Sequence, residues 1–384
     1  MNNFSYKNCT EIVFGRGTEA EAGARMAQLG KKVLLVYGGG SIKKSGLYDR
    51  ITASLNEAGL SWTELSGVMP NPRLSLVYEG IEKCRREGVD CILAVGGGSV
   101  MDTAKTIGIG AIYGGDVWEL FDKGMVDVPM LPLGVVVTIP ASGSESSHAA
   151  IITRDEGNLK RALASQNARP AFAILNPELT YTLPPFQTAC GIADMLCHVM
   201  ERYLCMEGRS EVTDRTGEGL MRAIINLAPV VMREPNNYDA RADLMWAGTI
   251  AHNDFFGVGR DQDWAAHNIE HEVSAEYEMA HGAGLAIVFP AWCRFIQKER
   301  RWRFVQFAVR VWDVDLWYGD EDAIIEEGIS RLQRFFESLG LKTSFTAAGI
   351  GDEKFDKMAS TDSPIGFYRH LSKEDILEVL RLAL

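Results

Sequence analysis

The chain has 384 residues, of which 46% are hydrophobic and 23% charged, and its formal net charge is −12. This composition is typical of a folded globular protein, and the length favours two domains. The acidic balance argues against nucleic-acid and anionic-membrane partners, because both require a basic face. The seven cysteines form no CxxC pair and the first residues carry no secretory signal, so we expect reduced thiols and a cytoplasmic location.

The first half of the chain alternates between helical and strand-like segments. Helical spacing predicts helices over 19–30, 42–60 and 71–88, and apolar runs predict strands over 31–37 and 89–95. Because these strands are apolar enough to be buried on both faces, they predict a parallel sheet covered by helices. We therefore expect an α/β dinucleotide-binding domain over residues 1–180.

The second half is dominated by helical spacing, which covers 184–231, 238–252, 264–279 and 321–339. Strand-like runs become rare beyond about residue 180, where turn residues and a Pro-Pro pair mark the change. We therefore expect an all-helical domain over residues 181–384.

Triple glycine followed by serine ends two of the predicted strands, at Gly38-Gly39-Gly40-Ser41 and Gly96-Gly97-Gly98-Ser99. Because glycine lacks a Cβ, such a turn lets backbone N–H groups approach a phosphate at the start of the next helix. Glycine also ends strands for steric reasons alone, so one loop is a weak signal. Two loops at the carboxyl ends of neighbouring strands together predict a dinucleotide site.

The residues after each glycine loop refine this prediction. After the second loop, we expect Ser99 to cap a helix, and Asp102 either to bind a ribose hydroxyl or to complete the cap. The first loop lacks an acidic residue for the adenosine 2′-hydroxyl and is followed by Lys43 and Lys44. This pattern favours NADP(H) over NAD(H), although lysines near a helix start are also commonly solvated.

Candidate metal ligands concentrate in the second half. Asp194 and His198 are four residues apart in a helical stretch, so they project from one face. His267, His271 and His281 follow within WAAHNIEHEVSAEYEMAHG. Neutral imidazoles and a carboxylate suit a divalent ion such as Zn²⁺ or Fe²⁺. The spacing therefore makes Asp194, His198, His267 and His281 a candidate metal site.

These motifs together resemble a known family. GGGSVMDTAK, TIPASGSE from Thr138 to Glu145, the D-x-x-x-H pair, and H-x-x-x-H with a following HG are similar to the iron-containing (group III) alcohol dehydrogenases. The resemblance covers nearly the whole chain. PNP near Asn71 and WAxHxIEHxxSAxY from Trp264 most resemble the NADPH-dependent butanol dehydrogenase and aldehyde reductase branch.

The resemblance implies a Rossmann-like dinucleotide domain followed by an all-α metal-binding domain, an architecture similar to that of dehydroquinate synthase, and a homodimer. It assigns the metal to the same four residues as the spacing does, and it places His271 near the reacting centre without making it a ligand. It assigns these residues to the cofactor: Gly38, Gly39, Ser41, Asn71, Gly97, Gly98, Ser99, Asp102, Thr138, Ser142 and Lys160.

We therefore expect a metal-dependent NADP(H) alcohol dehydrogenase that acts mainly as an aldehyde reductase on short or medium-chain aldehydes. The Fe²⁺ or Zn²⁺ ion would act as a Lewis acid on the substrate oxygen. His271, one turn from His267, is a candidate proton relay, although a packing role would use the same helix face. Aromatic residues are candidates to line an apolar substrate pocket: Trp246, Phe255, Phe256, Trp264, Phe367 and Tyr368.

Two other functions fit parts of the pattern. A cyclising lyase of the dehydroquinate synthase type also combines a nicotinamide nucleotide with a metal, but it requires basic side chains for a phosphate-bearing substrate. A non-enzymatic nucleotide-binding or filament-forming module with a structural metal is the second alternative. Loss of a ligand would favour that module, and the four candidate ligands are all present.

Overall fold

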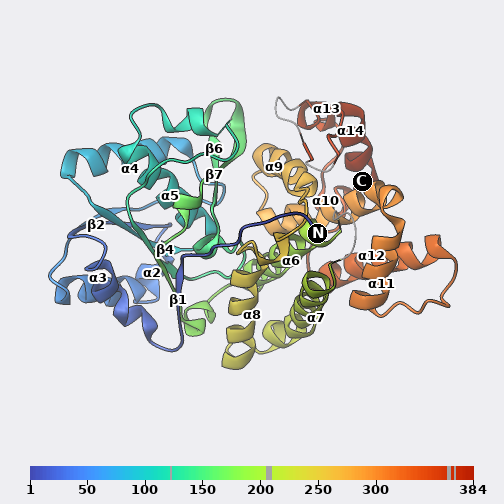
Figure 1. Ribbon diagram of the computed structural model, residues 1–384, viewed down its shortest axis with the longest axis horizontal. Helices are drawn as coiled ribbons and strands as arrows, with labels where there is room; N and C mark the ends of the chain where they lie inside the picture. Colours follow the sequence, from blue (N-terminus) through green and yellow to red (C-terminus); the bar gives the residue numbers. More distant parts are fainter. Residues whose placement is uncertain (122, 205–209, 361–364, 367–368) are drawn as a thin grey trace. The chain divides into compact units, whose positions relative to one another are not determined.

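The computed structural model describes residues 1–121, 123–204, 210–360, 365–366 and 369–384 (Figure 1). The chain forms two compact units. The sheet unit comprises Lys7–Leu183 and Asn236–Thr249, and the helical unit comprises Met1–Tyr6, Pro184–Pro235 and Ile250–Leu384. Within the described residues, no helix combines the length and apolar character needed to cross a membrane.

A six-stranded parallel sheet forms the centre of the sheet unit, with the strand order β1-β8-β5-β4-β2-β3. All carboxyl ends of a parallel sheet meet at one edge, so the loops after β2 and β4 leave neighbouring strands on the same side. The prediction of a parallel α/β fold is confirmed. The strand bounds are β1 Glu11–Phe14, β2 Lys32–Tyr37, β3 Ser61–Leu65, β4 Cys91–Gly96, β5 Leu133–Val137 and β8 Phe172–Leu175.

Alternate residues of each central strand enter two different hydrophobic cores. In β2, Leu34 and Val36 belong to one core, whereas Val33 and Leu35 belong to the other. Side chains of a strand point alternately to the two faces, so both faces must be apolar when helices cover both. This is why the strands read as continuous apolar runs. The first core includes residues of α4 (Leu74–Glu87) and α5 (Gly98–Ile112), and the second includes residues of α1 (Ala22–Met26) and α3 (Leu47–Glu57).

Two of the predicted helices are shorter than expected. The stretch 42–60 divides into α2 (Ser41–Lys44) and α3, because Gly46 adopts a left-handed conformation with φ of 72° and ends the first helical turn. The stretch 19–30 begins as a 3₁₀ turn at Thr18–Glu21 and is α-helical only in α1. Helical spacing did not distinguish these breaks, since the apolar face continues across them.

The sheet unit also differs from the prediction in two ways: it contains a hairpin that was not predicted, and it includes most of a helix that was expected in the second domain. Strands β6 (Ala149–Arg154) and β7 (Leu159–Ala164) form a separate antiparallel hairpin. The helix α8 (Tyr238–Ala251) lies beyond the predicted domain boundary at residue 180, yet its residues through Thr249 group with the sheet unit. Thr249 donates a hydrogen bond of 2.6 Å from its hydroxyl to the buried Glu145 carboxylate, which joins α8 to the loop after β5.

In its described residues, the helical unit consists of helices joined by loops, as the sequence predicted. The helix α10 packs against α6, α9, α12 and α14. The predicted stretch 264–279 corresponds to α9, and 321–339 corresponds to α12. The bounds are α6 Pro185–Tyr203, α7 Glu211–Arg233, α9 Ala265–Tyr277, α10 His281–Ile296, α11 Arg301–Trp312, α12 Glu321–Ser338, α13 Phe355–Met358 and α14 Lys373–Leu382.

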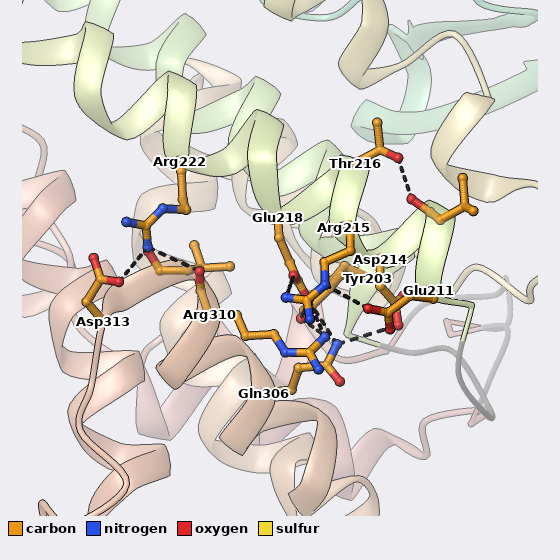
Figure 2. A network of polar contacts seen from close by, with 12 residues as sticks. Tyr203, Glu211, Asp214, Arg215, Thr216, Glu218, Arg222, Gln306, Arg310 and Asp313 are labelled. Carbon is orange, nitrogen blue, oxygen red and sulfur yellow. Dashed lines mark hydrogen bonds and ion pairs between the residues drawn. The ribbon is translucent and has the colours of Figure 1, made fainter.

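A buried polar network joins α7 to α11 in the helical unit (Figure 2). The Asp214 carboxylate accepts hydrogen bonds from Arg260 at 2.9 Å and from Arg303 at 2.8 Å, and all three side chains are at most 1% exposed. One turn along α7, the Glu218 carboxylate accepts from the Tyr203 hydroxyl and from Gln306. Arg260 belongs to the segment between α8 and α9, so the network also anchors the chain that leads into α9.

Candidate metal centre and nucleotide loops

The second glycine loop is closely packed against the chain that follows β5. A Cβ on Gly98 would lie 2.5 Å from the Ser142 Oγ, and one on Gly97 would lie 3.1 Å from Ile139. The Thr138 amide donates to the Gly96 carbonyl at 3.0 Å. The structure therefore brings Gly97, Gly98, Thr138 and Ser142 together at the carboxyl edge of β4 and β5. A side chain at Gly98 would therefore displace Ser142, and one at Gly97 would crowd Ile139.

The helix after this loop begins two residues earlier than predicted. α5 begins at Gly98, and Gly97 occupies the N-cap position without a side-chain cap, so Ser99 is not the capping residue. Asp102 does not complete a cap either. Its Oδ1 accepts from the Ser144 hydroxyl at 2.6 Å, and its Oδ2 accepts from the Ile151 amide at 3.1 Å. Burial raises the pKa of Asp102, against the opposing charge of Lys105.

Lys105 completes this internal network. Its ammonium is fully buried and donates to the Ser144 hydroxyl at 2.8 Å and to the carbonyls of Ser147 and Ala149 at 3.0 and 2.8 Å. Asp102 and Lys105 therefore pin the loop after β5 to α5. These contacts indicate that Asp102 helps to hold the chain after β5 against α5, next to the second glycine loop.

Two further residues assigned to the cofactor contact one another. The Lys160 ammonium, on β7, donates to the Asn71 side-chain oxygen at 3.0 Å, and both residues are buried. Asn71 has φ of 53°, a left-handed conformation that asparagine tolerates better than most residues. The hairpin β6–β7 thus supplies a cation beside the PNP turn.

The first glycine loop has an acidic neighbour that lies outside the loop itself. Glu64 on β3 accepts hydrogen bonds from the hydroxyls of Tyr37 and Tyr48 at 2.8 and 2.9 Å. Lys43 Nζ lies 3.9 Å from the Glu64 carboxylate and 4.6 Å from the centre of the Tyr48 ring. Gly38 and Gly39 follow β2 directly, and Ser41 begins α2. Lys43 is therefore held near this loop by a carboxylate and an aromatic ring.

The four candidate metal ligands come from three helices of the helical unit. Asp194 and His198 lie on α6, His267 on α9, and His281 is the first residue of α10. Gly282 allows α10 to approach α6, since a Cβ there would lie 2.0 Å from the Cys190 carbonyl oxygen. The three histidines of the WAAHNIEHEVSAEYEMAHG stretch are thus divided between two helices.

The candidate ligand atoms surround one oxygen. Nε2 of His198, His267 and His281 lies 3.6, 3.9 and 3.6 Å from Asp194 Oδ1, beyond hydrogen-bond distance. Ligands that bind Zn²⁺ at about 2.1 Å lie about 3.4 Å apart in a tetrahedron. Among the described residues, the buried His267 Nε2 has no hydrogen-bond partner. Buried polar atoms are normally satisfied, so this spacing fits an ion among them.

The three histidines are not equivalent in how closely they converge. One ligand atom each from Asp194, His267 and His281 lies within 4.8 Å of the others. His198 approaches Asp194 on the same helix, and its ring lies 4.9 Å from that of His267. Burial and the neighbouring imidazoles, His252 foremost, lower the pKa of His198 well below its usual value. A neutral imidazole is the form that ligates a metal.

Two buried glutamates that sequence reasoning missed stand behind the candidate ligands. Glu201 accepts from His267 Nδ1 at 3.0 Å, and Glu270 contacts His281 Nδ1. Both carboxylates are fully buried. A signal was available in the sequence, because each glutamate follows a candidate ligand histidine by three residues and so lies one helical turn away.

His271 lies close to the candidate ligands, whereas the residues of the predicted aromatic pocket differ in burial and in the unit to which they belong. His271 is buried on α9, and its ring centre lies 5.6 Å from that of His281. Trp264 packs edge-on against His267, at 5.1 Å between ring centres. Phe256 is buried, whereas Phe255 and Trp246 are 36% and 43% exposed, and Trp246 belongs to the sheet unit. Phe367 and Tyr368 lie outside the described residues.

Comparisons with known proteins show the family to which the chain is related. Residues 9–177 match the family model "Iron-containing alcohol dehydrogenase", and residues 188–384 match "Fe-containing alcohol dehydrogenase family, C-terminal". The probable NADH-dependent butanol dehydrogenase 1 of Bacillus subtilis is 42% identical over the full length of both chains. The NADPH-dependent aldehyde reductase YqhD of Escherichia coli is 38% identical over 91% of this chain and 90% of its own.

A solved structure has the same fold. The NADH-dependent butanol dehydrogenase A of Thermotoga maritima superposes with a TM-score of 0.95 at 38% identity, covering 100% of this chain and 99% of the other. The family models cover most of the chain and the relatives span its length, so both the fold and the reaction class follow. The chain belongs to the iron-containing alcohol dehydrogenase family and is an oxidoreductase of that family.

Proposed function

We propose that this protein is a metal-dependent, NADP(H)-linked alcohol dehydrogenase that works mainly as a reductase of short or medium-chain aldehydes. In this proposal Asp194, His198, His267 and His281 hold one divalent ion. The observation that carries the proposal is the arrangement of three imidazole Nε2 atoms 3.6–3.9 Å from a single buried carboxylate oxygen. The ligand set suits Fe²⁺ and Zn²⁺ alike.

The chemistry of this site follows from its charges. Hydride transfer to an aldehyde places negative charge on the carbonyl oxygen, and a bound divalent ion supplies the Lewis acid that stabilises it. Three neutral imidazoles add no charge, so Asp194 leaves the ion with a net charge near +1 from its direct ligands. The ring of Trp264 packs edge-on against the ring of the buried His267.

The proton that the substrate oxygen gains on reduction needs a donor. We assign this role to His271, which is buried one helical turn from His267, with its ring 5.6 Å from that of His281. Its position next to two candidate ligands, without being counted among the four, supports a relay. In the alcohol direction the same imidazole would accept the proton.

The cofactor preference rests on the first glycine loop. The loop itself carries no carboxylate, and Lys43 and Lys44 follow it on α2. A 2′-phosphate would meet cations there, whereas a ribose 2′-hydroxyl would find no acidic partner within the loop. Relatives with both preferences exist by name, so cofactor choice depends on local residues rather than on the fold. The homodimer expected from the family resemblance stays a prediction.

A direct assay tests this function. We expect the purified protein, supplied with Zn²⁺ or Fe²⁺, to oxidise NADPH in the presence of butyraldehyde. The loss of NADPH absorbance measures this reaction. NADH in a parallel reaction should give a lower kcat/KM. Absence of NADPH oxidation across a panel of aldehydes with either ion would contradict the proposed reaction, and better use of NADH would contradict only the cofactor preference.

A further inference from the structure

Each of two candidate ligand histidines has a buried carboxylate on the ring nitrogen that faces away from Asp194. Glu201 Oε1 lies 3.0 Å from His267 Nδ1, and Glu270 Oε2 contacts His281 Nδ1. The Nε2 atoms of the same two rings lie 3.9 and 3.6 Å from Asp194 Oδ1. Both rings therefore stand between a carboxylate on one side and the candidate metal position on the other.

This arrangement fixes the tautomer of each ring. An ionised carboxylate only accepts hydrogen bonds, so the proton of a neutral imidazole beside it must be on Nδ1. The Nε2 lone pair is then free to ligate a metal. Carboxylate partners of this kind also orient the ring and make the ligand nitrogen more basic.

The glutamates are themselves held from more than one side. The second oxygen of Glu201 accepts from the Trp264 backbone amide at 3.1 Å, and its first oxygen also accepts from the His267 amide at 3.1 Å. These amides lie at the beginning of α9, whose positive end favours an anion. Glu201, on α6, therefore ties the start of α9 to the helix that carries Asp194 and His198.

Glu270 occupies a space that the sequence keeps open. Its other oxygen accepts from the Ser274 hydroxyl one turn along α9. On the facing helix, a Cβ at Gly284 would lie 2.5 Å from Glu270 Oε1 and 2.8 Å from its Cγ. Glycine at this position of α10 thus lets the carboxylate reach His281.

We propose that Glu201 and Glu270 are positioning residues, which hold His267 and His281 in the Nδ1-protonated tautomer and aim both Nε2 atoms at the ion. This inference rests on the proposed metal site. His198 differs, because its buried Nδ1 has no hydrogen-bond partner within the part of the chain that the structure describes. The ion is therefore held by two carboxylate-backed histidines and one that is oriented by packing alone, beside His252 and Trp264.

The test uses the near-isosteric variants Glu201→Gln and Glu270→Gln, stripped of metal and reloaded with Zn²⁺. A neutral amide cannot enforce the tautomer, so each variant should bind Zn²⁺ about 10–100-fold more weakly in competition with a chromogenic chelator. Ser274→Ala should also weaken Zn²⁺ binding, but by a smaller factor. Glu276→Gln is the matched control: it lies on the same helix but pairs with Lys354 and Lys357, and should leave Zn²⁺ affinity unchanged.

A spectroscopic readout separates positioning from a general loss of stability. With Co²⁺ in place of Zn²⁺, the visible ligand-field bands should shift in both glutamine variants and not in Glu276→Gln. If one glutamine variant does not fold, the other together with Ser274→Ala decides the question.

Unchanged Zn²⁺ affinity and an unchanged Co²⁺ spectrum in the folded glutamine variants would overturn the inference. His281→Ala serves as the reference for the metal site itself. If His281→Ala loses Zn²⁺ while Glu270→Gln keeps full affinity, only the positioning role fails. If His281→Ala also keeps full affinity, the ligand assignment fails with it.

Discussion

Lys43 is the residue on which the proposed cofactor preference most depends. Its ammonium lies 3.9 Å from Glu64 and near the rings of Tyr37 and Tyr48, so it is oriented even though its side chain is 48% exposed. Side-chain contacts to Tyr37, opposed by desolvation and aided by the charge of Glu64, raise the pKa of Lys43. The residue is therefore a permanent cation beside the first glycine loop at physiological pH.

Replacement of this lysine should separate the two cofactors. We expect Lys43→Ala to lower kcat/KM for NADPH about tenfold, since a hydrogen bond to a charged group contributes about 1.5 kcal/mol at a partly exposed site. The kcat/KM for NADH should change little, because NADH lacks the 2′-phosphate. Steady-state kinetics with both cofactors measures this difference, and equal losses with NADPH and NADH would refute a phosphate contact.

Individual residues also show which parts of the candidate site could be predicted from the sequence. Asp194 and His198 could be chosen as candidate ligands because residues four apart on a helix share a face. Glu201 and Glu270 carry the same kind of signal, but a glutamate on a helix is ordinarily a solvated residue, and only burial reveals its partner. Glu64 was missed for a different reason. Its approach to Lys43 depends on the pairing of β2 with β3, which the sequence alone does not fix.

At the scale of elements, the ion pairs of Asp214 with Arg260 and Arg303 hold α7, α11 and the segment before α9 together. Two guanidiniums share this one buried carboxylate. Burial opposes the ionisation of Asp214, but the hydrogen bonds and charges of Arg303 and Arg260 outweigh it and lower the pKa of Asp214. The carboxylate therefore contributes stability above its unfolded-state pKa and loses that contribution as the pH falls through its folded-state pKa.

Removal of this carboxylate should be costly at neutral pH. We expect Asp214→Asn to lower the free energy of unfolding by about 3–5 kcal/mol at pH 7, since it leaves buried guanidiniums without their counter-ion. The deficit should shrink below about pH 4, where Asp214 of the unfolded wild type becomes protonated, and it should be smallest below the lowered folded-state pKa of Asp214. Urea unfolding across this pH range measures the effect. Glu211→Gln, which breaks an exposed pair with Arg215 on the same helix, should have no measurable effect; equal effects of the two variants would contradict the argument.

Elements were predictable where one periodicity continued for a full helix or strand. The central strands and α9 and α12 follow such patterns closely. The break at Gly46 depends on a single left-handed residue inside a continuous apolar stripe, and α10 contains a proline that sequence rules read as a helix end. The hairpin β6–β7 was not predicted, because its two strands are short and mix apolar with polar residues. Their pairing is set by the tertiary fold.

At the scale of the whole molecule, the two sets of candidate site residues belong to different units. All residues assigned to the cofactor belong to the sheet unit, and all four candidate ligands belong to the helical unit. Loss of the ion should therefore stop the reaction without removing the nucleotide site. In the proposed reaction, hydride transfer requires both the cofactor site and the metal site to be intact.

The most direct test of the central claim is the metal content of His267→Ala beside that of the wild type, measured on protein purified without chelators. We expect about one divalent ion per wild-type chain. For the variant we expect no stoichiometric metal, no reduction of butyraldehyde, and retained NADPH binding by fluorescence titration. A His267→Ala protein that keeps a full equivalent of metal and reduces butyraldehyde at the wild-type rate would contradict the account.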